Sequence, residues 1–186
     1  LDLQSPLARA LYWLTTTGTA PYGVATVLVV LALAYCYMPK ALFINLFLAI
    51  SLSQVLSLST SHALKSFFKE PRPNLVYLSE QALPDDAQLT PQTFYQLAKP
   101  ERSQAIAEAL TELQTRTSAV KLSPKIHQHW EDEIGYSFPS GHTIFAVTLV
   151  LTASYYLLLA GLPLFTSALL VWGLLMGLSR MLLGMH

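Results

Sequence analysis

Three short segments of this 186-residue chain carry cations and histidines at defined spacings. They are Lys65-x6-Arg72-Pro73, Pro139-Ser140-Gly141-His142, and Ser179-Arg180-x5-His186. Guanidinium and ammonium groups match phosphate oxygens, and a Ser-Gly pair that opens a helix offers backbone N–H groups to an anion. Two histidines can act as nucleophile and general acid. The set therefore predicts chemistry on a phosphate group, with Lys65, Arg72 and Arg180 supplying the positive charge and no metal ion required.

Each segment also has a structural interpretation. The basic residues around Lys65 and Arg72 could anchor the chain to lipid headgroups, and Ser140 is an ordinary helix N-cap. Arg180 could extend its side chain towards the membrane surface. A cap needs no histidine, however, and Arg180 is the only Lys, Arg, Asp or Glu within the apolar runs, where an ionisable residue is functional by default.

The spacing of Arg180 and His186 in the third segment limits how their side chains can meet. Six helical residues rotate the chain by roughly 600°, so Arg180 and His186 do not share a face of a straight helix. Either Gly184 ends the helix early, or the long arginine side chain reaches His186 from beside it.

Hydropathy indicates a membrane protein. Hydrophobic residues make up 53% of the chain, charged residues 12%, and the formal net charge is zero. The neutral charge argues against nucleic-acid binding, and the single Cys36 excludes a disulfide framework. Four apolar runs approach the length of about 20 residues that crosses a bilayer. They are 21–38, 41–64 with a hydroxyl-rich second half, 143–160 and 164–185. We expect the hydroxyl groups of the second run to face neighbouring helices or a cavity.

Charged residues concentrate in one insert. Eight basic and ten acidic residues lie within 65–139, which we interpret as an extramembrane insert of one membrane domain covering 1–186. Within it, 91–117 is predicted to be helical, and 74–90 and 121–137 are predicted to be loops. Residues 1–20 hold leucines at helical spacing and are predicted to form an interfacial helix. The fold class is thus an all-α, polytopic membrane helical bundle.

Four antiparallel spans place certain chain ends on one side of the membrane. The end of the second span, the start of the third and the end of the fourth share a side with the insert, so the three segments can form one site. Lys40, in a short turn on the opposite side, favours a cytoplasmic location for that turn.

The other histidines offer a rival site. His127 and His129 lie beside Glu131, Asp132 and Glu133, a set that could bind a divalent metal. Such loop residues are more often solvated, and we predict no metal and no cofactor.

Taken together, the three segments resemble the signature of the type-2 phosphatidic acid phosphatase superfamily, and the fuller wording resembles one of its bacterial branches. The likeness runs from Lys65 to His186. It implies a metal-independent phosphatase with a phosphohistidine intermediate, in which His186 is the nucleophile and His142 protonates the leaving oxygen. By the same resemblance, the phosphate would be held by Lys65, Arg72, Ser140, Gly141 and Arg180.

The resemblance also implies substrates and a location. The branch acts on lipid phosphates and pyrophosphates, including phosphatidylglycerophosphate, phosphatidic acid and undecaprenyl pyrophosphate, at the periplasmic face of the bacterial inner membrane. The family usually has six spans, and it has an Asp four residues after the nucleophilic histidine. This chain shows four spans and stops at His186, so we interpret it as part of a longer protein.

Two alternatives remain open. One is a phosphatase of soluble esters, or a vanadate-dependent haloperoxidase, on the same signature. The other is a transporter or lipid-binding protein that uses the cations only to hold an anion. The four apolar runs argue against the first, and binding alone does not require His186.

Overall fold

The computed structural model describes residues 2–81, 89–116 and 122–186. These divide into two compact units. The membrane unit consists of Trp13–Leu64 and Pro139–Arg180, and the polar unit consists of Leu1–Tyr12, Lys65–Phe138 and Met181–His186. All regular structure in the described ranges is helical, which confirms the all-α prediction. Residue 1 of the predicted interfacial helix, and 82–88 and 117–121 of the predicted insert, lie outside the described residues.

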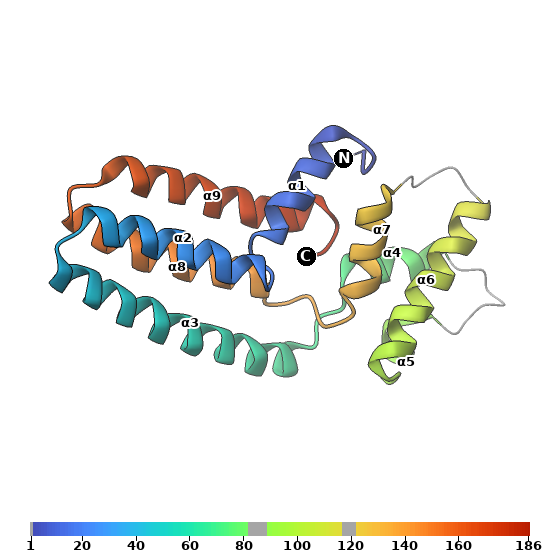
Figure 1. The fold of residues 1–186 in the computed structure, drawn as a ribbon. Helices are drawn as coiled ribbons and strands as arrows, with labels where there is room; N and C mark the ends of the chain where they lie inside the picture. Colours follow the sequence, from blue (N-terminus) through green and yellow to red (C-terminus); the bar gives the residue numbers. More distant parts are fainter. Residues whose placement is uncertain (1, 82–88, 117–121) are drawn as a thin grey trace. The chain divides into compact units, whose positions relative to one another are not determined.

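Four helices build the membrane unit and run alongside one another (Figure 1). They are α2 (Tyr22–Tyr37), α3 (Lys40–Phe68), α8 (Gly141–Leu159) and α9 (Pro163–Leu182), of which α3 contributes up to Leu64 and α9 up to Arg180. Their shared core is formed by small and branched apolar side chains, among them Ala34, Leu46, Ile50, Leu149, Ala153 and Leu169. Helices α8 and α9 approach each other closely, because Gly173 has no side chain and lies directly against Val150.

Three of the predicted spans are confirmed by length and hydropathy within the described residues. Helix α3, within the candidate span Lys40–Gln81, and helices α8 and α9 are each long and apolar enough to cross a membrane. The first predicted span forms an apolar helix, α2, of 16 residues. That length corresponds to about 24 Å of helix, shorter than the roughly 30 Å hydrocarbon core.

The outer face of the membrane unit is apolar. Leu28, Leu52, Leu151 and Leu174 leave 59%, 62%, 64% and 70% of their surface exposed. Exposed leucines on all four helices are unfavourable in water but match a lipid environment, because a bilayer solvates apolar side chains and the helices satisfy their own backbone groups. The chain is therefore a polytopic membrane helical bundle.

The hydroxyl-rich half of α3 contacts α8 at two positions. Ser53 Oγ lies 3.3 Å from Thr152 Oγ1, and Gln54 Nε2 donates to the carbonyl of Phe145 at 3.1 Å. The hydroxyls of Ser51 and Thr60 instead donate to carbonyls of their own helix. The expectation that polar side chains of the second apolar run face a neighbouring helix is therefore confirmed for Ser53 and Gln54. Ser51 and Thr60 form hydrogen bonds within α3 instead.

The polar unit contains short helices around a core of its own. They are α4 (Pro73–Gln81), α5 (Pro91–Phe94), α6 (Lys99–Arg116) and α7 (Pro124–Asp132), and α6 packs against both α4 and α7. Helix α1 (Pro6–Thr16) supplies residues to both units. The buried apolar side chains of the insert include Leu75, Leu78, Phe94, Ile106, Leu110, Ile126 and Trp130.

The structure corrects the predicted loops of the insert. The helical prediction for 91–117 is confirmed by α5 and α6, which break between Tyr95 and Ala98, with residue 117 outside the described range. Helices α4 and α7, however, occupy segments that were predicted to be loops. Each is only 9 residues long, below the length at which an isolated helix is stable. Their packing on α6 supplies the missing stabilisation.

Candidate active site

Arg72 is a structural centre of the polar unit. It is 4% exposed. Its Nε donates to the Gly135 carbonyl at 2.8 Å and its Nη1 to the Met185 carbonyl at 3.2 Å, while its Nη2 lies 2.7 Å from Glu133 Oε2. A guanidinium has five N–H groups, so these three bonds leave further donors for a ligand. Arg72 therefore fixes the residue that precedes His186 and keeps capacity to bind an anion.

The backbone on either side of Arg72 is rigid. Helix α3 ends at Phe68, and Lys69 adopts a left-handed φ of 51°. Pro71 then prevents renewed helix formation at Glu70, because a proline disfavours the helical region for the preceding residue. Lys65, in the last turn of α3, donates from Nζ to the Tyr136 carbonyl at 3.1 Å. Two predicted cations thus reach the same turn, 135–136.

That turn is also tied to the first segment through Ser137. Its backbone N–H donates to the Glu70 carbonyl at 2.9 Å, and its hydroxyl donates to the Pro71 carbonyl at 3.0 Å. Ser137 is buried, so these bonds are shielded from water. Residue 137 is therefore fixed to the Lys65–Pro73 segment by one main-chain and one side-chain hydrogen bond.

His186 follows a sharp helix termination. Helix α9 ends at Leu182, Gly184 has a φ of 71°, and its N–H donates to the Met181 carbonyl at 3.1 Å. This confirms the alternative in which Gly184 ends the helix before His186. A glycine is favoured at such a helix end because the left-handed conformation strains other residues. Leu183 and Met185 are fully buried, which holds both neighbours of Gly184 in place.

Trp130 supports the same segment and was not singled out as a site residue from the sequence. Its Nε1 donates to the Leu183 carbonyl at 3.1 Å. A Cβ added at Gly184 would lie 3.4 Å from Trp130 Cζ2, so the ring packs closely against the glycine. Trp130 is the only tryptophan in 65–139, which is the only sequence signal for this role.

The second segment lies in the membrane unit at the start of α8. Ser140 is the N-cap, and its Oγ accepts from the Thr143 N–H at 3.3 Å. The capping interpretation of Ser140 is therefore confirmed. The bond satisfies one of the N–H groups that a helix start leaves without an intrahelical partner. Gly141 and His142 form the first turn of the helix.

His142 is held by residues near the N-terminus that sequence reasoning missed. Its Nε2 lies 2.6 Å from Thr19 Oγ1. A Cβ added at Gly18 would lie 3.4 Å from His142 Cδ2 and 3.1 Å from Met176 Cε, so the imidazole packs closely against that glycine. The sequence gives no signal for this pairing, since Thr19 and His142 are 123 positions apart.

Arg180 is fully buried near the end of α9. Its Nη1 lies 3.5 Å from Thr15 Oγ1. The burial contradicts the interpretation of Arg180 as a side chain that extends to the surface. A Cβ added at Gly177, one turn earlier, would lie 3.9 Å from Thr143 Cγ2. The end of α9 and the start of α8 therefore lie together within the membrane unit, close to His142.

The predicted site residues form two groups. Lys65, Arg72 and His186 belong to the polar unit. Ser140, Gly141, His142 and Arg180 belong to the membrane unit. Within each group, the contacts above connect segments that are far apart in the sequence.

The two histidines of α7 contact a carboxylate and an aromatic ring. His127 Nδ1 lies 3.0 Å from Glu131 Oε1, one helical turn away, and the His129 ring meets Tyr12 edge-on at 5.6 Å between centroids. Across the described ranges, no group of three or more His, Cys, Asp or Glu side chains comes close enough to hold a metal ion. The arrangement gives no support to the rival metal site.

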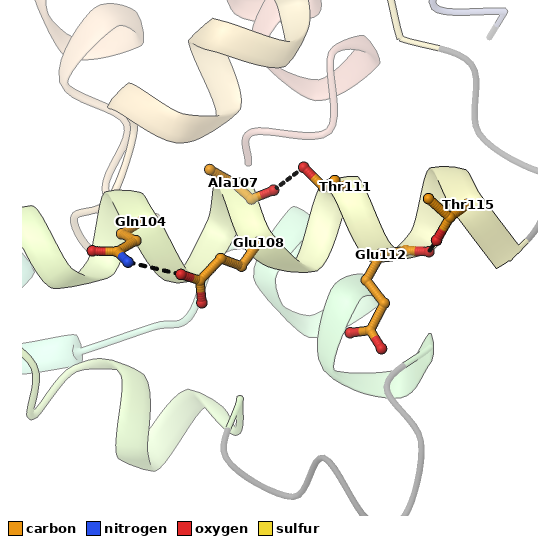
Figure 2. A pocket seen from close by; sticks show the side chains of 6 residues that line it. All are labelled: Gln104, Ala107, Glu108, Thr111, Glu112 and Thr115. Atoms are coloured by element: carbon orange, nitrogen blue, oxygen red, sulfur yellow. Dashed lines mark hydrogen bonds between the residues drawn. The ribbon is translucent and has the colours of Figure 1, made fainter.

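A shallow hollow along α6 is unsuited to phosphate. Its lining comes from one helix face, and the polar side chains bond within that helix (Figure 2). Gln104 Nε2 donates to Glu108 Oε1 at 2.7 Å, and the Thr111 hydroxyl donates to the Ala107 carbonyl. The described lining residues include Glu108 and Glu112 but no cation, so their charge disfavours an anion in this hollow.

Comparison with known proteins gives a consistent result. Residues 23–186 match the model of the PAP2 superfamily. Phosphatidylglycerophosphatase B of Haemophilus influenzae is 38% identical over 191 residues, which cover 98% of this chain and 75% of the relative. Phosphatidylglycerophosphatase B of Escherichia coli K12 is 33% identical over 187 residues, which cover 98% of this chain and 68% of the relative.

Proposed function

The chain belongs to the PAP2 superfamily, and from this premise we propose that it removes phosphate from membrane lipids through a phosphohistidine intermediate. Its relatives are named as phosphatidylglycerophosphatases, which supports its assignment as a lipid phosphatase. We propose phosphatidylglycerophosphate, phosphatidic acid and undecaprenyl pyrophosphate as the substrates of this chain.

The reaction has two transfers at phosphorus. A ring nitrogen of His186 attacks phosphorus, the bond to the leaving oxygen breaks, and His142 gives that oxygen its proton. Neutral His142 then takes a proton from water, the oxygen of which attacks the phosphohistidine. The nitrogen–phosphorus bond breaks, and inorganic phosphate and free His186 result.

The phosphate is proposed to lie among fixed positive groups. Lys65, Arg72 and Arg180 neutralise the charge that develops on its oxygens, and the start of α8 at Ser140 and Gly141 contributes backbone N–H groups. These donors take the neutralising role that a metal ion has in other phosphatases, so we propose that no metal or cofactor is required.

The bond from Arg72 Nη1 to the Met185 carbonyl is the observation that carries this proposal. A residue that only anchored the chain to headgroups would be exposed. Arg72 is buried instead and joined to the residue before the proposed nucleophile. We also propose that the protein lies in the bacterial inner membrane with its site facing the periplasm, in line with the apolar helices and the bacterial relatives.

Phosphate release from a long-chain lipid phosphate in detergent, with excess chelator, tests the mechanism. His186→Ala is compared with His127→Ala, a histidine of the same unit that the mechanism does not use. We expect release to survive chelation, to vanish in His186→Ala and to persist in His127→Ala. A trapped phosphoenzyme, detected by acid-labile ³²P on the unmutated protein, would identify the intermediate directly.

Other outcomes distinguish the alternatives. Release that chelation and His127→Ala both abolish would indicate a metal site on α7. Anion binding without any release would indicate a transporter or binding protein. Equal turnover of soluble phosphate esters and long-chain lipids would indicate an enzyme that does not recognise the lipid.

A further inference from the structure

A pocket of about 370 Å³ lies in the polar unit next to the Lys65–Pro73 segment. Part of its wall is a stacked pair of rings, Tyr95 and Tyr136, with centroids 4.2 Å apart. Arg102 supports Tyr95, because its Nη2 donates to the Tyr95 carbonyl at 2.7 Å and its guanidinium lies 5.4 Å from the ring centroid. Two rigid rings, Pro71 and Pro91, complete the apolar part of the lining.

The polar side chains of the pocket define a ligand chemistry. Lys69, Gln92 and Gln96 line it and are exposed, and none of the described lining residues is Asp or Glu. Among the described lining residues, the Lys69 ammonium is therefore the only charge. Burial raises the pKa of the Tyr95 hydroxyl, which keeps this group protonated and uncharged. An ammonium suits an anion, amides suit hydroxyl groups, and aromatic faces suit the C–H groups of a polyol.

The pocket shares its backbone with the proposed phosphate-binding cations. The ring of Tyr136 lines the pocket, and its carbonyl accepts the bond from Lys65 Nζ at 3.1 Å. The carbonyl of Gly135 accepts from Arg72 Nε at 2.8 Å and from the Tyr95 hydroxyl at 3.4 Å. A ligand in the pocket would therefore contact the turn that orients Lys65 and Arg72.

We propose that this pocket binds an anionic polyol, namely the glycerol-phosphate part of a lipid headgroup adjoining the phosphate that is hydrolysed. This assignment rests on the proposed function. It makes the pocket a selectivity site for lipids that carry a phosphorylated glycerol headgroup. Phosphatidic acid, in which the phosphate is attached directly to diacylglycerol, lacks the group that would occupy the pocket. The same chemistry could come from a free polyol phosphate, which the experiment distinguishes.

Steady-state kinetics of the full chain test the assignment. Lys69→Asn removes the charge, and asparagine tolerates the left-handed φ of 51° at this position. Lys99→Asn removes an exposed lysine of the same unit that does not line the pocket and serves as the control. We expect Lys69→Asn to raise KM for phosphatidylglycerophosphate by about tenfold, the effect of losing one charge-assisted contact. The kcat for this lipid and the KM for phosphatidic acid should stay within about twofold.

A second variant tests the hydroxyl contacts. Gln96→Ala removes an exposed amide of the pocket without altering charge, and we expect a KM change in the same direction and confined to the same lipid. Equal KM changes for both lipids, or no change in either variant, would overturn the assignment.

Direct binding separates this inference from the proposed function. Glycerol 3-phosphate is titrated calorimetrically into His186→Ala protein, which cannot turn over, and into the same protein with Lys69→Asn or Lys99→Asn. If no lipid is hydrolysed by the unmutated protein but Lys69→Asn alone weakens glycerol 3-phosphate binding, the proposed function fails and the pocket is a site for a free polyol phosphate. If lipids are hydrolysed and Lys69→Asn changes neither binding nor KM, the pocket assignment alone fails.

Discussion

Arg72 Nη1 donates a hydrogen bond to the backbone carbonyl of Met185, 3.2 Å away and 113 positions later in the chain. This bond joins the first cationic segment to the residue that precedes the proposed nucleophile, His186. The same guanidinium pairs with Glu133 at 2.7 Å. The position of His186 therefore depends on the Arg72–Glu133 ion pair as well as on the backbone conformation of the residues that precede it.

The Arg72–Glu133 pair should be important for stability. The two side chains are 5% and 18% exposed, so Glu133→Gln leaves a buried guanidinium without its countercharge. We expect a loss of about 3 kcal/mol in the free energy of unfolding. Thermal unfolding in detergent measures the change. Glu108→Gln, on the exposed face of α6, is the control and should shift the stability by less than about 0.5 kcal/mol. Similar stability of the two variants would contradict the role given to the pair.

Gly184→Ala should lower the activity of the protein, whereas its effect on stability should match that of a control substitution. Its φ of 71° strains an alanine, and the added Cβ would lie 3.4 Å from Trp130. Gly161 is a matched control, with a φ of 72° and no heavy atom within 4 Å of an added Cβ. Each alanine should cost about 1 kcal/mol of stability. Only Gly184→Ala should also lower kcat, by about tenfold or more, because it displaces His186. An unchanged kcat in Gly184→Ala would show that this turn does not position the nucleophile.

Thr19 should act on His142 as a positioning residue. Its hydroxyl lies 2.6 Å from His142 Nε2, and Thr19→Val removes that partner with little change in shape. We expect kcat to fall by about tenfold, an altered pH dependence of kcat, and recovery in Thr19→Ser. Thr60→Val, at a hydroxyl that bonds only within α3, provides the comparison. A Thr19→Ser variant as impaired as Thr19→Val would argue against the hydroxyl as the cause.

Packing between α8 and α9 should depend on Gly173. A Cβ added there would lie 2.6 Å from Val150 Cγ2, a contact that a stiff β-branched side chain cannot relieve. Gly173→Ala should lower the unfolding free energy by about 2 kcal/mol. Combining it with Val150→Ala removes the clash, so the double variant should be more stable than the sum of the two single changes predicts. Additive effects in the melting curves would exclude direct contact.

The sequence by itself determined the long helices of the chain and the residues that are suited to phosphate chemistry. Apolar runs of near-membrane length, ended by Pro39 or by Gly161 and Pro163, predict α2, α3, α8 and α9 because local hydropathy and backbone restrictions act without distant partners. Residue types and spacing alone likewise marked out Arg72, His142 and His186 as the residues suited to phosphate chemistry.

Only the tertiary structure decided the partners of those residues. Arg72 with Met185, His142 with Thr19 and Trp130 with Leu183 pair segments separated by 113, 123 and 53 positions, which no local pattern encodes. Helices α4 and α7 were missed for the same reason. Their 9 residues are too short to be helical alone, and burial against α6 supplies the stabilisation that their sequences lack.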